Sequence, residues 1–233
     1  MIQELKLNIP EPATDILIFV HGFGVRWDSR GMFTDIRQSL PEGWGSVLFD
    51  LYKIEGKDVF VSSIEEQTQR LSKVLEQVKL NYPKLRTHLL AHSQGCMISA
   101  LLKPKVSGKV IFLAPPEKIG SRLEEYFDSY PGSERKTGEL IVPRKDGTIT
   151  HIPEEYFKQT ANSDVQDFIL QYSKEQNISL LHATEDEVLG PKISYSKLAN
   201  VLSISIAKLA ADHNFTAQSR PELVSYVNQV LAS

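Results

Sequence analysis

The sequence predicts an α/β domain built on a doubly wound, mostly parallel central sheet with helices on both faces. Three observations lead to this prediction. Most strand candidates are near-continuous apolar runs, which are typical of strands buried on both faces of a parallel sheet. Stretches with helical periodicity alternate with these runs along the chain. With 233 residues and 41% apolar residues, the chain suits a single domain, 1–233, with a substantial core.

The expected elements follow one another along the whole chain. A helix is expected over 64–78, where apolar residues recur at the helical period. Another is expected over 221–231, because Pro221 stands at a first-turn position that proline tolerates. The expected strands are the apolar runs 4–9, 16–21, 46–52, 88–91, 109–114, 179–183 and 203–207.

The pentapeptide Ala91-His92-Ser93-Gln94-Gly95 lies between a predicted strand and an apolar helical stretch. A serine with a small residue two positions away on each side is typical of a nucleophile elbow. The tight turn holds the hydroxyl above the sheet, and the helix N-terminus behind it favours developing negative charge. The alternative is a buried strand that runs into a helix capped by a serine.

A serine nucleophile needs a base and an acid that orients the base. After an elbow they are expected in the order serine, acid, histidine. Of the six histidines, His213 alone combines this order with a polar loop after a late strand. The acid is expected to be Asp186, in an acidic loop after a strand end. Glu185, Glu187 and Asp212 remain open as alternatives.

A second motif, His21-Gly22-Phe23-Gly24, ends a fully apolar run near the N-terminus. Glycines let the backbone approach a ligand closely. The tetrahedral intermediate of acyl transfer carries an oxyanion that needs two positioned N–H donors. We expect these donors to be the backbone N–H groups of Phe23 and Gln94. The alternative is a glycine turn after a buried strand.

In order and approximate spacing, these motifs resemble the α/β-hydrolase superfamily. The resemblance covers nearly the whole chain apart from its middle segment, and it implies a carboxylesterase-like serine hydrolase. Two departures stand out: Ala91 and Ala183 occupy positions where glycine is usual or common in that superfamily. Alanine is small enough for both positions, so we expect adjusted packing rather than lost activity.

The middle segment, 116–177, is longer than one crossover helix requires. Within it, 139–144 and 148–153 are expected to form a β-hairpin around the turn Asp146-Gly147, with helical pieces on either side. The resemblance implies that this insertion forms a small cap or lid over the active site. A small excursion at the sheet edge is the alternative.

Composition limits the partners and the location. A net charge of −3 gives no basic footprint for nucleic acid. The single cysteine, Cys96, excludes an intrachain disulfide. The first residues lack the pattern of a signal peptide and no apolar run reaches membrane-spanning length, so a cytoplasmic protein without membrane insertion is expected. No metal-ligand spacing appears, and no cofactor is expected.

The expected function is hydrolysis of small or short-chain carboxylic esters, with a small-molecule ester or lactone as substrate. Ser93 would attack the carbonyl carbon, His213 would transfer the proton and Asp186 would orient His213. Phe23 and Gln94 would hold the oxyanion. Two alternatives stay open: a lactonase that opens cyclic esters with the same machinery, and a non-catalytic member of the fold that binds a small ligand or a partner protein.

Overall fold

The computed structural model describes residues 5–190 and 193–233 of the chain, with 120–122 described by their backbone alone. Glu4, the first residue of the expected strand 4–9, lies outside the described residues. Across the described ranges, no helix is both long enough and apolar enough to span a bilayer.

The central sheet has seven strands in the order β1-β3-β2-β6-β7-β11-β12. β1 pairs antiparallel with β3, and every other pair of neighbours is parallel. All seven expected strands are present. The third was expected over 46–52 but ends at Leu48, where the chain leaves the sheet. The strands are β1 (Lys6–Asn8), β2 (Asp15–Val20), β3 (Trp44–Leu48), β6 (Arg86–His92), β7 (Val110–Leu113), β11 (Ile178–Ala183) and β12 (Ile204–Leu209).

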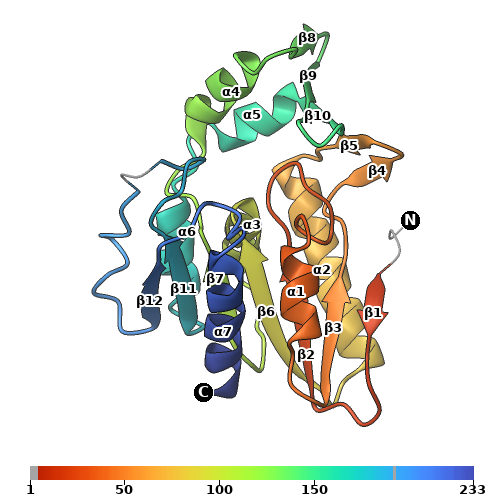
Figure 1. Cartoon of the computed structure of the whole chain (residues 1–233), viewed down its shortest axis with the longest axis vertical. Coiled ribbons are helices and arrows are strands. Elements are labelled where there is room, and N and C mark those ends of the chain that lie inside the picture. The colour runs from red at the N-terminus through yellow and green to blue at the C-terminus, as the bar shows by residue number, and fades with distance from the viewer. Residues whose placement is uncertain (1–4, 191–192) are drawn as a thin grey trace.

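Helices cover both faces of this sheet (Figure 1). One face carries α1 (Met32–Gln38) and α7 (Ser219–Ala232), and the other carries α2 (Ile64–Asn81), α3 (Gln94–Leu102) and α6 (Val165–Tyr172). The apolar residues of β2 are buried on both faces of the sheet. Ile16, Ile18 and Val20 pack in the core on the α2 side, whereas Leu17 and Phe19 pack on the α7 side. This double burial confirms the doubly wound architecture.

The helices that were predicted have local start signals in the sequence, such as a capping residue. Helix α2 begins with a capping box, in which the Ser63 side chain accepts the Glu66 backbone N–H and the Glu66 carboxylate accepts the Ser63 N–H. Helix α1 follows Gly31 without a side-chain cap, so its start has no comparable signal in the sequence. The expected helices 64–78 and 221–231 correspond to α2 and α7.

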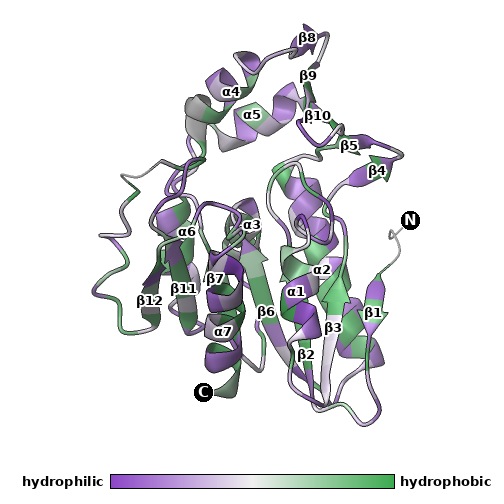
Figure 2. Ribbon diagram, in the orientation of Figure 1, coloured by the Kyte–Doolittle hydropathy of each residue, from purple (hydrophilic) through white to green (hydrophobic). Residues whose placement is uncertain are grey.

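A second, five-stranded sheet stands beyond the carboxyl ends of the central strands (Figure 1). Its order is β4-β5-β10-β9-β8, and with α4 and α5 we call it the upper module. Figure 2 shows apolar residues concentrated in the central strands and many hydrophilic residues on α4 and β8. The module consists of β4 (Lys53–Glu55), β5 (Asp58–Phe60), α4 (Gly120–Asp128), β8 (Glu134–Lys136), β9 (Glu139–Pro143), β10 (Ile149–Pro153) and α5 (Glu154–Thr160).

The expected hairpin is confirmed as the antiparallel pair β9–β10. The hairpin β4–β5 was not expected, and it joins the module because β5 pairs parallel with β10. Helix α6 lies within the 116–177 segment but belongs to the central layers. There Ile169 is fully buried and the Tyr172 hydroxyl donates a hydrogen bond of 2.7 Å to the carbonyl of Pro104.

Candidate active site

The chain turns sharply at Ser93, between β6 and α3, with a φ of 52°. A non-glycine residue in this region is strained, as the nucleophile elbow requires. A Cβ atom on Gly95 would lie 2.3 Å from the carbonyl oxygen of Val20 and 2.7 Å from that of His21, so this position needs glycine. Ala91, at the other small position, is accommodated fully buried within β6.

The structure brings together the three residues expected to form a triad. The Oγ of Ser93 lies 2.9 Å from Nε2 of His213, and Nδ1 of His213 lies 2.7 Å from Oδ2 of Asp186. An ionised carboxylate only accepts hydrogen bonds, which assigns the proton to Nδ1 and leaves Nε2 free to accept the serine proton. Only 8% of Ser93, 6% of His213 and 2% of Asp186 is exposed. We call these residues the candidate triad.

Asp186 is held in place by its own loop. Its Oδ1 accepts the backbone N–H groups of Val188 at 3.0 Å and Leu189 at 2.7 Å, while Oδ2 faces His213. Burial alone would raise the pKa of Asp186, but the hydrogen bond and charge of His213 and these two N–H groups together lower it. The carboxylate therefore stays ionised where a neutral His213 is needed.

The other three acids considered from the sequence lie elsewhere. Glu187 accepts the backbone N–H of His213 at 3.0 Å through Oε2, so it supports the histidine loop. Asp212 accepts the backbone N–H of Thr216 at 2.8 Å and also its hydroxyl. Glu185 is exposed to solvent. Of the four carboxylates, Asp186 is the one that meets the His213 ring.

His92 supports the same loop from the opposite side. Its Nε2 donates a hydrogen bond of 2.9 Å to the carbonyl of His213, and its Nδ1 lies 3.5 Å from the Oγ of Ser29. The His92 and His213 rings stand 5.0 Å apart between centroids. His213 is thus fixed through its backbone by His92 and Glu187, and through its ring by Asp186.

The Tyr52 hydroxyl braces the expected oxyanion loop. It lies 3.1 Å from the carbonyl of Gly22, the residue before Phe23, and this carbonyl also accepts a hydrogen bond of 2.8 Å from Nδ1 of His21. Gly24 has a φ of 62°, which favours glycine. The second expected donor, Gln94, begins α3, where backbone N–H groups have no partner within the helix. This role of Tyr52 was not predicted from the sequence, in which the residue stands at the end of an expected strand.

The Gln94 side chain ties the elbow to the upper module. Its Oε1 lies 3.2 Å from the hydroxyl of Tyr156 on α5 and 3.4 Å from that of Tyr52. Its Nε2 donates to Oε1 of Gln67 on α2 at 2.7 Å. Burial raises the pKa of the Tyr52 and Tyr156 hydroxyls, so both remain protonated donors. A buried polar network of this kind fixes one arrangement of its members.

Tyr52→Phe is expected to lower kcat about tenfold or more, with a smaller change in KM. Without the hydroxyl the Gly22 carbonyl keeps only the hydrogen bond of 2.8 Å from Nδ1 of His21, and the Phe23 N–H is less well oriented toward the developing oxyanion. Steady-state kinetics on a short-chain p-nitrophenyl ester measures the split between kcat and KM. Tyr172→Phe is the matched control, because it removes a buried hydroxyl bonded to the Pro104 carbonyl outside the site. Equal kcat losses in both variants would contradict this role for Tyr52.

Two buried histidines make stability depend on pH. Burial lowers the pKa of His21 to about 4. Burial, followed by the neighbouring charge of His213, lowers the pKa of His92 to about 3. Their ordinary pKa is 6.5, so the unfolded chain takes up these two protons at a higher pH than the folded chain does. Their contribution is therefore complete above pH 6.5 and is lost as the pH falls toward 4.

We expect the free energy of unfolding to fall by about 1.4 kcal/mol per pH unit for each of these histidines below pH 6. Urea unfolding at pH 7, 6 and 5 measures the slope. His92→Gln removes one of the two groups and should reduce the slope by about one proton. A free energy of unfolding that is the same at pH 7 and pH 5 would contradict the burial of neutral histidines.

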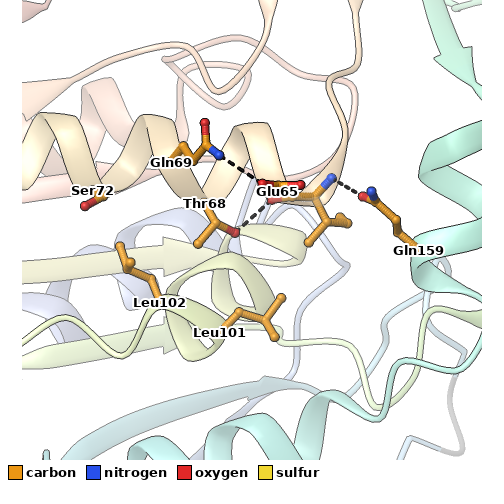
Figure 3. Close-up of a pocket in the computed structure, with 8 residues that line it drawn as sticks. Glu65, Thr68, Gln69, Ser72, Leu101, Leu102 and Gln159 are labelled. Atoms are coloured by element: carbon orange, nitrogen blue, oxygen red, sulfur yellow. Dashed lines mark hydrogen bonds between the residues drawn. The ribbon is translucent and has the colours of Figure 1, made fainter.

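The described residues also contain a groove that lies away from the candidate triad. It has a volume of about 600 Å³ and lies between α2, the end of α3 and α5 (Figure 3). The Gln159 side chain accepts the backbone N–H of Ile64 at 2.7 Å there and so joins α5 to the start of α2. None of the three triad residues lines this groove. Within the described ranges, no cluster of three or more histidine, cysteine or acidic side chains could hold a metal ion.

Comparison with solved structures establishes the fold. Est1E from Butyrivibrio proteoclasticus superposes with a TM-score of 0.69 at 16% identity, over 97% of this chain and 91% of that one. The esterase domain of a Rhodothermus marinus protein gives a TM-score of 0.66 at 16% identity, over 96% and 89%. An α/β serine hydrolase without lid from Xanthomonas campestris gives 0.59 at 14% identity, over 98% and 87%. No family model and no curated protein matches the sequence. The chain has the α/β-hydrolase fold.

Proposed function

We propose that this chain, which has the α/β-hydrolase fold, is a serine hydrolase that cleaves carboxylic esters of small or short-chain substrates. One observation carries the proposal. Ser93 has a strained backbone, its Oγ lies 2.9 Å from Nε2 of His213, and Nδ1 of His213 lies 2.7 Å from Oδ2 of the buried Asp186. A protein that only binds ligands has no need of all three groups in this order. The structurally similar esterases support the same chemistry.

In the proposed reaction, Ser93 Oγ attacks the ester carbonyl carbon while His213 Nε2 takes the hydroxyl proton. The backbone N–H groups of Phe23 and Gln94 hold the oxyanion of the tetrahedral intermediate. His213 then protonates the leaving alcohol, and an acyl-enzyme remains on Ser93. Water gives a proton to His213 and attacks the acyl carbon. The bond between the acyl carbon and Ser93 Oγ then breaks, His213 returns the proton to Oγ, and the carboxylic acid leaves. Asp186 stabilises the imidazolium in both halves of the reaction.

We further propose that the upper module is the cap of this active site. Its support is contact with the oxyanion loop: the Phe23 ring lies 5.1 Å from Phe127 and 5.2 Å from Tyr156, measured between centroids. Aromatic walls and a nearly buried Ser93 favour compact acyl groups over long lipids. Est1E has a solved structure with ferulic acid bound, so aryl esters belong in the first substrate screen beside short-chain esters and lactones. The cytoplasmic location remains a prediction.

Labelling with a fluorophosphonate tests the proposal directly. An activated serine attacks the phosphorus and gains one stoichiometric adduct, which intact mass detects and peptide mapping assigns to a residue. We expect one adduct on Ser93, and none on the Ser93→Ala variant. Ser99→Ala is the matched control, because Ser99 lies in α3 and donates to the carbonyl of Gly95 rather than to a base; it should keep the label.

Two results would overturn the proposal. Folded protein that gains no adduct would favour the non-catalytic member of the fold that binds a small ligand. An adduct on another serine would mean that the candidate triad is not the reactive centre. Screening of esters and lactones is justified once the adduct on Ser93 is established.

A further inference from the structure

The β9–β10 hairpin carries two polar residues on a face that is otherwise apolar. Alternation along the strands buries Leu140 and Val142 on β9, and Ile152 on β10. Thr150 is opposite Val142 and is fully buried with them. Arg144 follows β9 by one residue and continues the same alternation. A charged side chain here needs a physical reason, because this is the buried face of the hairpin.

Arg144 lies against aromatic rings and forms no close ion pair among the described residues, although the charge of Asp146 is near enough to raise its pKa. Its Cζ is 5.3 Å from the centroid of Phe127 and 6.0 Å from that of Tyr130. In the part of the chain that the structure describes, no carboxylate lies within 4 Å of its guanidinium nitrogens. Phe127 in turn contacts Phe23. One aromatic ring therefore separates this guanidinium from the loop that carries the expected oxyanion donor.

A second arginine, Arg30, lies in a stretch of left-handed backbone and contacts the turn that carries Arg144. Ser29, Arg30 and Gly31 have consecutive φ values of 48°, 57° and 84°, and left-handed residues of this kind cluster at functional sites. Arg30 reaches the turn that carries Arg144, because its Nη2 lies 3.8 Å from Oδ2 of Asp146, two residues further along, and its charge adds to burial in lowering the pKa of Arg144. Its one ion pair among the described residues, to Asp146, is 3.8 Å long and about half exposed, so it stabilises little.

Thr150 lies on the buried face of the same hairpin, opposite Val142. Among the described residues its buried Oγ1 has no hydrogen-bond partner. A Cβ atom on Gly24 would lie 3.6 Å from this oxygen, so the hydroxyl faces the loop next to Phe23. A buried hydroxyl without a partner is costly, and a bound ligand is one way to satisfy it.

We propose that Arg144 and Arg30, with the Thr150 hydroxyl, form a subsite for a carboxylate carried by the substrate. The guanidinium fork matches a carboxylate in shape and charge, and packing against two rings preorganises it. This inference rests on the proposed function and deepens it: the preferred substrates are monoesters of dicarboxylic acids. Ser93 attacks the ester carbonyl while the free carboxylate at the other end binds Arg144.

The test compares kcat/KM for monoethyl esters of dicarboxylic acids of increasing length with that for neutral analogues in which an amide replaces the free carboxylate. We expect the wild type to prefer the acids at one or two chain lengths. Arg144→Gln should lower this preference ratio about tenfold or more, because one charge-assisted contact is lost. Lys145→Gln removes the same charge from the exposed neighbouring position and should keep the ratio.

Asp146→Asn is expected to raise the preference for acids, whereas Arg144→Gln lowers it. The substitution keeps an oxygen that can accept the backbone N–H of Thr148, as Asp146 does at 3.0 Å, but removes the carboxylate that competes for Arg30. The preference ratio should rise about two- to threefold, as for a weak exposed ion pair. A gain of preference cannot result from damaged folding. If Arg144→Gln fails to fold, this variant and Arg144→Lys, which keeps the charge, decide the question.

The inference is overturned if the wild type shows no preference for acids, or if Arg144→Gln and Asp146→Asn leave the ratio unchanged. In both cases ester turnover still stands, and only the subsite fails. Calorimetry measures binding of the uncleaved monoester to Ser93→Ala and tests the subsite even if the wild type has no esterase activity. If the wild type cleaves no ester, binding that is lost in a Ser93→Ala, Arg144→Gln double variant supports the subsite while the proposed function fails. Absence of binding as well would overturn the subsite too.

Discussion

Ser93→Ala is expected to reduce kcat for ester hydrolysis by a factor of at least about 10⁴, with a melting temperature close to that of the wild type. If Ser93 is the nucleophile, its loss removes the acyl-enzyme route and leaves only what the oxyanion donors can do for direct attack by water, which in well-studied serine proteases is a small part of the total. Kinetics on a p-nitrophenyl ester, with thermal unfolding of the same sample, measures both quantities.

The melting temperature should hold because Ser93 contributes little packing of its own. Its hydroxyl bonds to His213, and alanine adopts the same backbone with the same strain. Normal turnover in this variant would exclude Ser93 as the nucleophile. A large fall in melting temperature would instead assign the loss of activity to damaged structure.

Asp186→Asn is expected to lower kcat by about 10³- to 10⁴-fold, the second largest effect. The same replacement of the acid by an amide has an effect of this size in a serine-protease triad. An amide N–H₂ facing Nδ1 selects the His213 tautomer with its proton on Nε2. That tautomer cannot accept the proton of Ser93, which lies against Nε2 at 2.9 Å. The lost charge also leaves the imidazolium unstabilised. Kinetics should show the loss in kcat with little change in KM.

The neighbouring carboxylates serve as matched controls for Asp186. Glu185→Gln and Asp212→Asn make the same chemical change at positions outside the contact with the His213 ring, so kcat should stay within about threefold of the wild type. Glu187→Gln should give a small loss, because the amide oxygen can still accept the His213 N–H. A larger loss in Glu185→Gln or Asp212→Asn than in Asp186→Asn would move the acid to that residue.

The central layers were predictable because their signals are local. Runs such as Ile16–Val20 are apolar at every position, and this pattern excludes a strand with one solvated face. The nearness of Ser93, Asp186 and His213 was predictable because, after a nucleophile elbow, an acid and then a histidine are expected in loops that follow later strands. Asp186 was preferred to Glu185 and Glu187 because it stands three residues after the small Ala183 at the strand end, and it is the acid that meets the His213 ring.

The residues that brace the site were not predictable, because their roles depend on distant pairing. Tyr52 ends an apolar run and has no pattern that distinguishes a bracing hydroxyl from core packing. The hairpin β4–β5 consists of two three-residue strands whose partner, β10, comes far later in the chain. Helix α6 lies in the segment interpreted as an insertion, yet Ile169 buries it against the central layers.

The upper module draws its sheet from two separate stretches of chain, 53–60 and 134–153, joined by the parallel pair β5–β10. During synthesis, β5 therefore leaves the ribosome with an open edge and must wait for β10 to arrive before its ladder closes. The same division constrains engineering. A module exchanged between proteins of this fold by swapping only the later segment would leave β5 without its partner, so a chimera must carry both stretches together.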